Sequence, residues 1–202
     1  MKYKAFVFFL LFALMLIAQH AQAFVITPEL EREIAEKRKT VQANPNDPNA
    51  HFDLGMTYAY SNFIQEGLDE LKKVEALDKD FAPKAIKIYK EKVTRDPNNW
   101  KTKFRFAFAL FFGGDKPGAI NQLEEILQSN PNNIWAYGYM ALAYGEIGNY
   151  DKSIELCKKA LEMDSKVSSI RFALGQAYFK KGKNWHGFWQ TAEAARLKAV
   201  GN

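Results

Sequence analysis

Cysteine is almost absent from this sequence, because the 202 residues contain only Cys157. A single thiol closes no disulfide within the chain, so the fold must depend on packing rather than on covalent cross-links. Cys157 falls on the apolar stripe of an expected helix, and we therefore interpret it as a buried, unreactive side chain.

Catalytic and metal-binding patterns are missing as well. His51 and His186 have no cysteine, second histidine or carboxylate near them at the spacing of metal ligands. The sequence has no Gly-x-Ser-x-Gly motif and no glycine loop of the kind that binds phosphate. We therefore expect a protein that is not an enzyme and that takes no metal and no cofactor.

Excess charge of one sign is small. The net charge is +5, and it falls to +3 without the first 23 residues, which contain two lysines and no acid. This balance is too mild to indicate a nucleic-acid partner. We expect another protein or a peptide as the partner, and no small-molecule substrate.

Only one long apolar run occurs, over residues 5–18. Fourteen residues of helix reach about 21 Å, whereas a membrane-spanning helix must cross about 30 Å. Two lysines precede the run, and the small residues Ala21 and Ala23 follow it in the pattern that signal peptidase accepts. We predict a signal peptide over residues 1–23 and an exported protein, periplasmic in the first place and secreted as the alternative. An uncleaved membrane anchor is the competing interpretation.

The strongest pattern that is present is an internal period of 34 residues. Gly114, Gly148 and Gly182 are spaced by this interval, and apolar residues with helical periodicity flank each of them. Each period therefore predicts two helices joined by a glycine turn. Two further sets of positions keep the interval: Ile86, Ile120 and Ile154, and Val93, Leu127 and Leu161.

The repeated unit resembles the tetratricopeptide repeat over residues 48–199. This resemblance implies an all-α fold, a right-handed α-solenoid of stacked antiparallel helical hairpins. Small residues at the crossing points are expected to let the two helices of a hairpin approach closely. The resemblance rests on Leu54-Gly55 with Tyr58, Leu174-Gly175 with Tyr178, Ala160-Leu161, Pro97 and Pro131, and the crossing points are Gly55, Ala107, Ala141 and Gly175.

The first unit is longer than the others. Pro45 and Pro97 are 52 residues apart, which is one period plus 18 residues, about a helix and a turn. We expect one extra helix there, and the sequence leaves open whether it is the segment 64–78 or the segment 83–94. The predicted division is a capping helix in residues 24–47 and a repeat array over residues 48–202. The units of the array are 48–97 with the insertion, 98–131, 132–165 and 166–199.

In proteins that this chain resembles, the first helices of the repeats line a concave groove that holds an extended or helical peptide. The residues at the matching positions form an apolar set, and two glycines of the third unit, Gly138 and Gly145, are expected to leave a depression for a ligand side chain. The competing interpretation is that the rings complete the packing between repeats or meet the extra helix. The predicted groove residues are Phe52, Met56, Tyr60, Lys101, Phe104, Phe108, Phe111, Trp135, Leu142, Phe172, Gln176 and Phe179.

Two other surfaces are candidate binding sites. The segment 84–105 carries an excess of positive charge, which suits peripheral binding to anionic lipid or polysaccharide, although the sequence favours a solvated helix face as the explanation. The last predicted helix contains Trp185, Phe188 and Trp189 with no further repeat to cover them, so these rings either fold inward or dock on something else. A third functional hypothesis is an accessory subunit of an envelope enzyme or assembly machine. The basic candidates are Lys84, Lys87, Lys90, Lys92 and Arg95.

Overall fold

The computed structural model describes residues 26–199, so the predicted signal peptide and its cleavage site at Ala21 and Ala23 lie outside the described residues. Within this range the chain forms ten helices and no strand, which confirms the predicted all-α class. The helices are α2 (Pro28–Ala43), α3 (Pro48–Ala59), α4 (Ile64–Leu77), α5 (Phe81–Arg95), α6 (Trp100–Phe112), α7 (Lys116–Ser129), α8 (Ile134–Glu146), α9 (Tyr150–Met163), α10 (Ser168–Lys180) and α11 (Asn184–Ala199).

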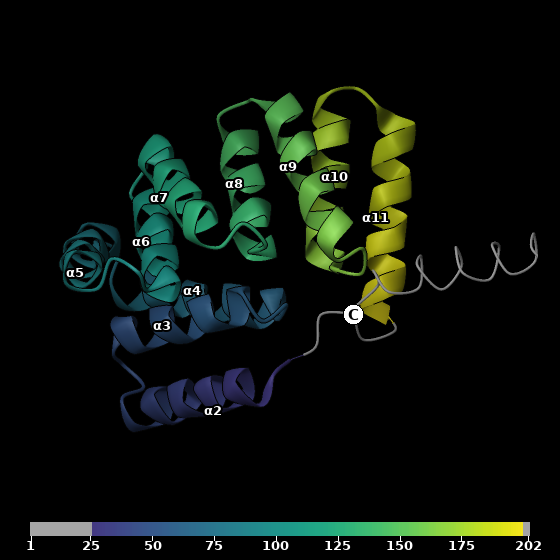
Figure 1. Cartoon of the computed structure of the whole chain (residues 1–202). Coiled ribbons are helices and arrows are strands. Elements are labelled where there is room, and N and C mark those ends of the chain that lie inside the picture. The colour runs from purple at the N-terminus through teal and green to yellow at the C-terminus, as the bar shows by residue number, and fades with distance from the viewer. Residues whose placement is uncertain (1–25, 200–202) are drawn as a thin grey trace, which may run out of the picture.

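Eight of these helices form four sequential hairpins, namely α3–α4, α6–α7, α8–α9 and α10–α11 (Figure 1). Helix α2 packs on α3, as a capping helix would. Helix α5 is the additional element, because α3 pairs with α4 while α5 packs against α6. Relative to α6, α5 takes the place that α7 has relative to α8 and that α9 has relative to α10. The extra helix therefore keeps the 34-residue period although it belongs to no hairpin.

The turns explain why the glycines recur. Gly114, Gly148 and Gly182 have φ angles of 89°, 82° and 71°, a region that glycine enters without steric cost. In the first hairpin the same place is taken by Asn62, with φ of 62°. Asparagine is among the few other residues that tolerate this conformation. A search of the sequence for turn glycines therefore does not find the first turn.

Two helices that open a repeat, α6 and α8, begin at asparagine caps. The side chain of Asn99 accepts a hydrogen bond from the backbone N–H of Thr102 at 3.0 Å, and Asn133 accepts one from Ala136 at 3.0 Å. Each of these bonds satisfies one of the backbone donors that a helix start leaves unpaired. The Pro-Asn-Asn segments that recur in the sequence thus stop one repeat and start the next.

Close helix crossings account for the small residues of the repeat. A Cβ atom added at Gly55 would lie 3.2 Å from the carbonyl oxygen of Gly67, and one added at Gly175 would lie 3.0 Å from that of Gly187. The helices of the first and last hairpins therefore touch backbone to backbone, and a larger residue at either crossing must push them apart. The expected close approach is confirmed at these two positions.

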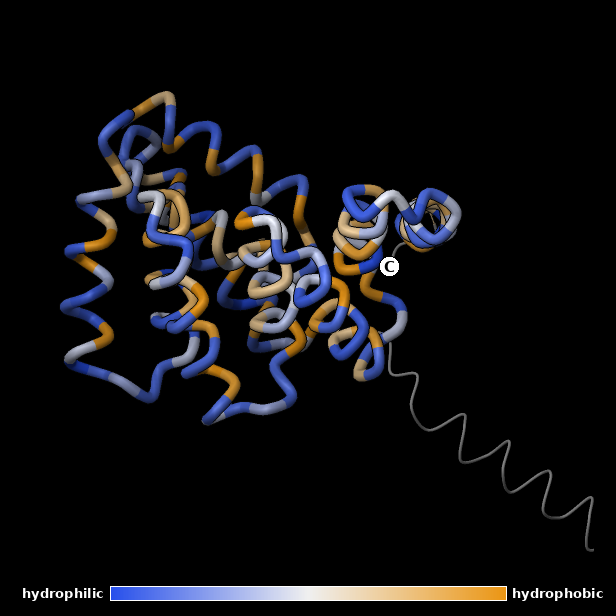
Figure 2. Tube along the Cα trace, turned by 90° about the horizontal axis from the view of Figure 1, so that it is seen from above, coloured by the Kyte–Doolittle hydropathy of each residue, from blue (hydrophilic) through white to orange (hydrophobic). Residues whose placement is uncertain are grey.

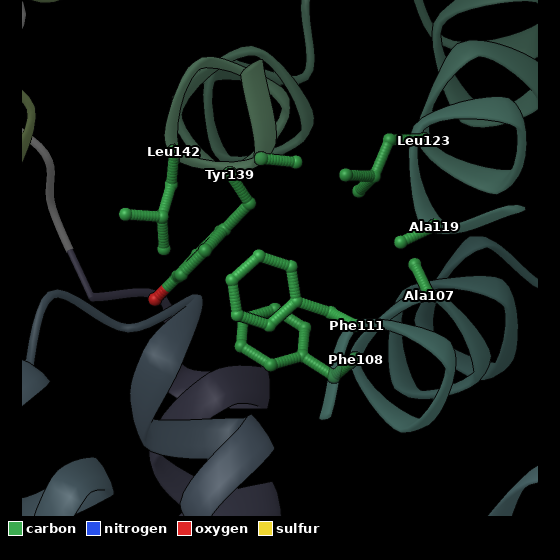
Figure 3. Close-up of a pocket in the computed structure, with 8 residues that line it drawn as sticks. Ala107, Phe108, Phe111, Ala119, Leu123, Tyr139 and Leu142 are labelled. Atoms are coloured by element: carbon green, nitrogen blue, oxygen red, sulfur yellow. The ribbon is translucent and has the colours of Figure 1, made fainter. Parts of the chain in front are cut away.

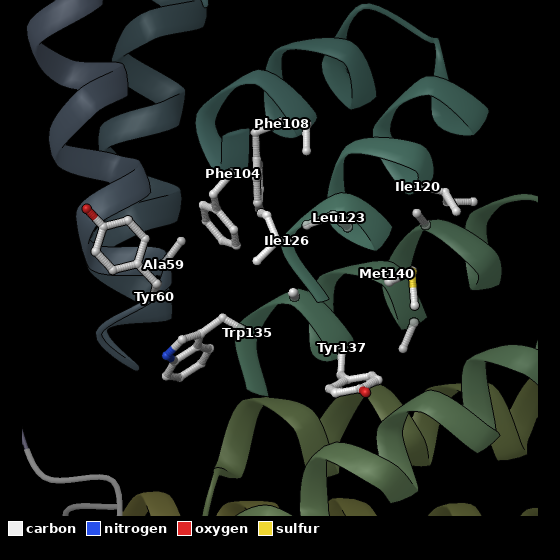
Figure 4. Packing of buried hydrophobic residues seen from close by; sticks show 14 of the residues in the cluster. Ala59, Tyr60, Phe104, Phe108, Ile120, Leu123, Ile126, Trp135, Tyr137 and Met140 are labelled. Carbon is white, nitrogen blue, oxygen red and sulfur yellow. The ribbon is translucent and has the colours of Figure 1, made fainter. Parts of the chain in front are cut away.

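One continuous apolar cluster runs through the hairpins, and its rings and aliphatic side chains interleave between neighbouring helices (Figure 4). Seen from above, apolar and polar residues alternate along the helices, as expected for elements that bury one face (Figure 2). Cys157 is 0% exposed, and burial raises the pKa of its thiol to about 12. This supports the interpretation of an inert side chain.

The N-terminal helices do not simply continue the row. Helices α2, α3 and α4 lie across the direction of α6 to α11 (Figure 1). The hydroxyl of Tyr139 on α8 donates to the carbonyl oxygen of Ala59 at 3.1 Å, and Ser169 on α10 donates to the side chain of Asn62 at 3.3 Å. The end of the first hairpin thus rests on the first helices of the later repeats, and it covers part of the face where a groove was predicted.

Candidate functional site

The part of this face that stays open is a pocket of about 380 Å³ between α8 and α10. Helix α8 contributes Trp135, Gly138 and Leu142, and α10 contributes Phe172 and Gln176. Residues from α4 and α9 complete the wall. A concave site lined mainly by apolar side chains with a few polar groups is the usual form of a ligand-binding site. The other lining residues are Ile64, Tyr139, Ala141, Gly145, Glu146, Tyr150, Ser153, Ser169, Ile170, Ala173, Ala177 and Lys180.

Two glycines shape this pocket, as the sequence led us to expect. A Cβ atom at Gly138 would lie 3.1 Å from the side chain of Ile170, so this glycine lets α8 and α10 come together at the pocket. A Cβ atom at Gly145 would meet only the hydroxyl of Ser153, at an ordinary 3.5 Å. Gly145 therefore leaves open space in the pocket wall rather than relieving a clash.

Large apolar side chains remain uncovered at this site. Leu142 is 41% exposed and Phe172 is 53% exposed, and both line the pocket. Glu146 and Lys180 line it as well and carry opposite charges. An occupant with an apolar face and polar flanks, such as a peptide or an amphipathic helix, matches this distribution.

A much smaller crevice lies on the other side of Tyr139, between α6, α7 and α8 (Figure 3). Phe108 and Phe111 of α6 face Tyr139 and Leu142 of α8 across it, and its volume is about 10 Å³. A space of this size holds at most one water molecule, so the crevice is not a second ligand site. Phe111, one of the predicted groove residues, lines this crevice and not the open pocket.

Half of the predicted groove residues are core residues instead. Three of them illustrate the cause: the ring of Phe52 packs on α5, the ring of Tyr60 packs on α6, and Phe104 packs against Tyr139 with ring centroids 5.1 Å apart. The interpretation that these side chains form an exposed strip is therefore wrong, because the extra helix, the crossing N-terminal hairpin and side chains of neighbouring repeats cover them. The buried members of the predicted set are Phe52, Met56, Tyr60, Phe104, Phe108 and Trp135, at 0% to 8% exposed.

The other half of the set divides further. Leu142, Phe172 and Gln176 line the open pocket, as does the nearly buried Trp135. Phe179 is 38% exposed but packs over Gly187 of α11, where an added Cβ atom would lie 2.7 Å from its ring. The structure thus concentrates the candidate site in the last two repeats.

Lys101, one of the predicted groove residues, instead belongs to a largely buried polar network that sequence reasoning missed. Its ammonium group donates to Glu33 of α2. The guanidinium of Arg105, with 8% of the side chain exposed, donates to Asp53 at 3.1 Å and to the hydroxyls of Thr57 and Tyr60 at 3.0 Å. The signal in the sequence was the position of Arg105, which lies between Phe104 and Phe106 in helix α6.

This network changes the acidity of its members. Burial alone raises the pKa of Asp53, but the charge of Arg105 and the hydrogen bond from Lys37 hold it below its usual value. Burial likewise raises the pKa of Glu33, and the hydrogen bonds from Lys101 and Tyr60 lower it more. Both carboxylates are therefore stabilised in the ionised form, and they tie α2 and α3 to α6.

We expect acid to weaken the attachment of the N-terminal helices. The folded-state pKa values of Asp53 and Glu33 lie below their unfolded values of about 4, so their stabilisation is complete above that pH. It is lost as the pH falls through the lowered folded values. The measurement is Tm between pH 7 and pH 3 in about 1 M salt, which screens exposed ion pairs. A Tm that falls as steeply in Asp53→Asn as in the wild type contradicts this assignment.

The basic segment 84–105 has less free charge than its sequence indicates. Lys84 pairs with Asp78 at 2.7 Å, and Lys103 pairs with Glu125 at 2.6 Å. Arg95 lies 3.9 Å from Glu91, and the ammonium of Lys92 lies over the ring of Tyr89 at 4.7 Å from its centroid. The predicted anionic-surface candidates Lys87 and Lys90 are exposed on α5. Since much of the positive charge is paired within the chain, this surface is a weaker candidate than the pocket.

Two other observations bear on function. His51 bridges α3 and α4 through hydrogen bonds to the carboxylate of Glu70 and the carbonyl oxygen of Pro45, so its role is structural. Over residues 26–199, no three or more His, Cys, Asp or Glu side chains are placed to hold a metal ion. No helix in that range has the length and apolar character needed to cross a membrane.

Comparison with known proteins agrees with the helical geometry. The tetratricopeptide repeat family model matches residues 134–166, which include α8 and α9. Over 117 residues the chain is 30% identical to anaphase-promoting complex subunit 3 of Dictyostelium discoideum, which covers 57% of this chain and 10% of that protein. This chain therefore contains a tetratricopeptide repeat. Its other repeats are hairpins of the same kind that the family model does not match.

Other relatives match more of the chain. It is 26% identical over 161 residues to human protein IFIT1 homolog B, covering 77% of this chain and 32% of that protein. Among solved structures, a MamA RS-1 double mutant superposes with a TM-score of 0.55 at 18% identity, covering 85% of this chain and 86% of the other. MamA MSR-1 superposes with a TM-score of 0.53 at 16% identity, over 77% and 98%. The chain spans about a third or less of the length of the curated relatives it matches. The structural likeness establishes the shared fold alone.

Proposed function

We propose that this tetratricopeptide-repeat chain is a non-enzymatic scaffold that binds a peptide or helix of another protein in the pocket between α8 and α10. The observation that carries the proposal is the pocket itself, about 380 Å³ and lined by the exposed apolar side chains of Leu142 and Phe172. A tetratricopeptide-repeat protein generally serves as a protein-interaction scaffold, and function in such repeat folds resides in their surfaces.

The proposed place of action is outside the cytoplasm, in the periplasm or secreted. It rests on the N-terminal sequence pattern, in which two lysines, a short apolar run and a small-residue cleavage motif follow one another. Whether the partner is a free peptide or a subunit of an envelope complex does not change the chemistry of the pocket. In either case an apolar side chain of the partner enters between Leu142 and Phe172.

Replacement of Leu142 and Phe172 by serine is expected to weaken partner capture by about tenfold or more. Each side chain removed takes away apolar surface that the partner would bury, at about 25 cal/mol per Å². The measurement is photo-crosslinking in cells, with a benzophenone amino acid placed at the exposed, pocket-lining Gln176, followed by quantification of the adduct. Far-UV circular dichroism and Tm should stay near wild type because both side chains are already exposed.

The matched control places the same benzophenone at Lys158, an exposed position on α9 outside the pocket. Adducts are expected from Gln176 and not from Lys158. Equal adduct yields from the wild type and the double variant contradict the proposed site. Variants of Phe104 or Phe108 do not test it, since these rings are buried and their removal damages the core.

A further inference from the structure

The outer face of the last helix carries an aromatic cluster that the proposed pocket does not use. Trp185, Phe188 and Trp189 of α11 are 66%, 55% and 58% exposed. The ring centroids of Trp185 and Phe188 are 5.9 Å apart and nearly parallel, and those of Trp185 and Trp189 are 6.0 Å apart, so the rings form one surface. Exposed patches of large apolar side chains on a monomer mark interaction sites.

The rings do not result from a missing next repeat. Trp185 and Trp189 stand one 34-residue period after Asp151 and Glu155 of α9, which are exposed although α10 and α11 follow them. Phe188 corresponds to Ile154, which the stack buries to 8% exposure. A second copy that extended the row would therefore cover Phe188 and leave both tryptophans outside. Their occupant must approach the outer face of α11.

The surroundings of this face are basic. Residues 180–198 contain the five basic residues Lys180, Lys181, Lys183, Arg196 and Lys198 and one acid, Glu193. Lys181 is paired with Asp151 of α9, and Lys180 lines the pocket between α8 and α10, so Lys183 and Lys198 are the lysines left for this face. Glu193 is already bonded to Arg196 at 2.7 Å. Lys183 stands two residues before Trp185, and Lys198 follows in the last turn; both are exposed. Tryptophan rings beside lysines are the combination that suits the boundary between lipid headgroups and hydrocarbon.

We propose that the aromatic cluster of α11 inserts into the headgroup region of an anionic lipid bilayer, with the neighbouring lysines on lipid phosphates. This surface is distinct from the basic segment 84–105 considered above. None of its three rings lines the pocket between α8 and α10, so the chain can hold lipid and a protein partner at the same time. Binding of this kind combines apolar burial with attraction of about fivefold in affinity per well-placed basic residue.

The test is tryptophan fluorescence of the full chain on vesicles of phosphatidylglycerol with brominated acyl chains. Bromine quenches only rings that enter the bilayer, and no tryptophan belongs to the apolar run of residues 5–18, so binding by that run does not mimic the signal. We expect quenching of the wild type. The variant Trp185→Ser with Trp189→Ser, which keeps only Trp100 and Trp135, is expected to lose it.

The control variant Phe172→Ser changes an exposed ring of the pocket and is expected to leave quenching unchanged. Co-sedimentation of the wild type with vesicles but without quenching overturns the proposal. Equal quenching on zwitterionic phosphatidylcholine vesicles overturns the role of the lysines. A dimer in sedimentation velocity that the double tryptophan variant abolishes, with no quenching on lipid, assigns the cluster to a second copy of this chain and also overturns the proposal.

Discussion

Replacement of Arg105 by methionine is expected to lower the free energy of unfolding by about 3 to 5 kcal/mol, the usual cost of removing one partner from a buried ion pair. Methionine keeps the length of the side chain but leaves Asp53 without the guanidinium at 3.1 Å, and it leaves the hydroxyls of Thr57 and Tyr60 without their donor. Domains have only about 5 to 15 kcal/mol of stability in total, so this loss is large. Urea unfolding followed by circular dichroism measures it.

Arg196 provides the matched control. It also pairs with a carboxylate, that of Glu193 at 2.7 Å, but its side chain is 60% exposed. Arg196→Met is therefore expected to cost less than about 1 kcal/mol, because an exposed ion pair is solvated whether or not it forms. If both methionine variants lose the same free energy of unfolding, the buried network does not make Arg105 more important than an exposed ion-paired arginine.

A double-mutant cycle separates the ion pair from general packing. In Asp53→Asn the guanidinium has lost its closer carboxylate and keeps only that of Glu33 at 3.4 Å, so adding Arg105→Met to this variant should cost less than it costs in the wild type. The hydroxyl of Tyr89 also donates to Asp53, and the amide oxygen introduced by the substitution retains an acceptor for that hydroxyl. Additive losses contradict a direct coupling between the two residues.

The repeat architecture was predictable because it rests on short-range chemistry that the sequence repeats. The glycines at positive φ and the asparagine caps recur with the 34-residue period, and each one fixes a turn or a helix start locally. The pocket was also partly predictable, since Gly138 lets α8 and α10 approach each other there and Gly145 has no side chain to fill the pocket wall. These inferences require only that each hairpin stacks on the next.

The N-terminal half was mispredicted for a physical reason. The family groove was carried over to Phe52, Phe104 and their neighbours on the assumption that all first helices face solvent on the same side. The extra helix α5 and the crossing of α3 over α8 are long-range contacts that no local period encodes. The 18 extra residues in the first unit predict an additional helix, but they do not predict which face of the array that helix covers.

The backbone contact between α10 and α11 gives the second large effect. Gly175→Ala is expected to destabilise the protein by about 1 to 3 kcal/mol, the range for overpacking a tight contact. The added Cβ atom would lie 2.6 Å from the Cγ2 of Thr191 and 3.0 Å from the carbonyl oxygen of Gly187. The backbone oxygen cannot move aside without separating the helices, so the helix-propensity gain of about 1 kcal/mol from alanine does not compensate.

Gly145→Ala is the matched control, because this glycine also lies in the first helix of a repeat but its added Cβ atom would be 3.5 Å from Ser153. Without a clash, the preference of alanine for helix should leave stability unchanged or raise it by up to about 1 kcal/mol. Thermal unfolding of both variants measures the difference. If Gly175→Ala is as stable as Gly145→Ala, the last hairpin relaxes freely, and the outward position of the α11 aromatic cluster is then not fixed by its packing on α10.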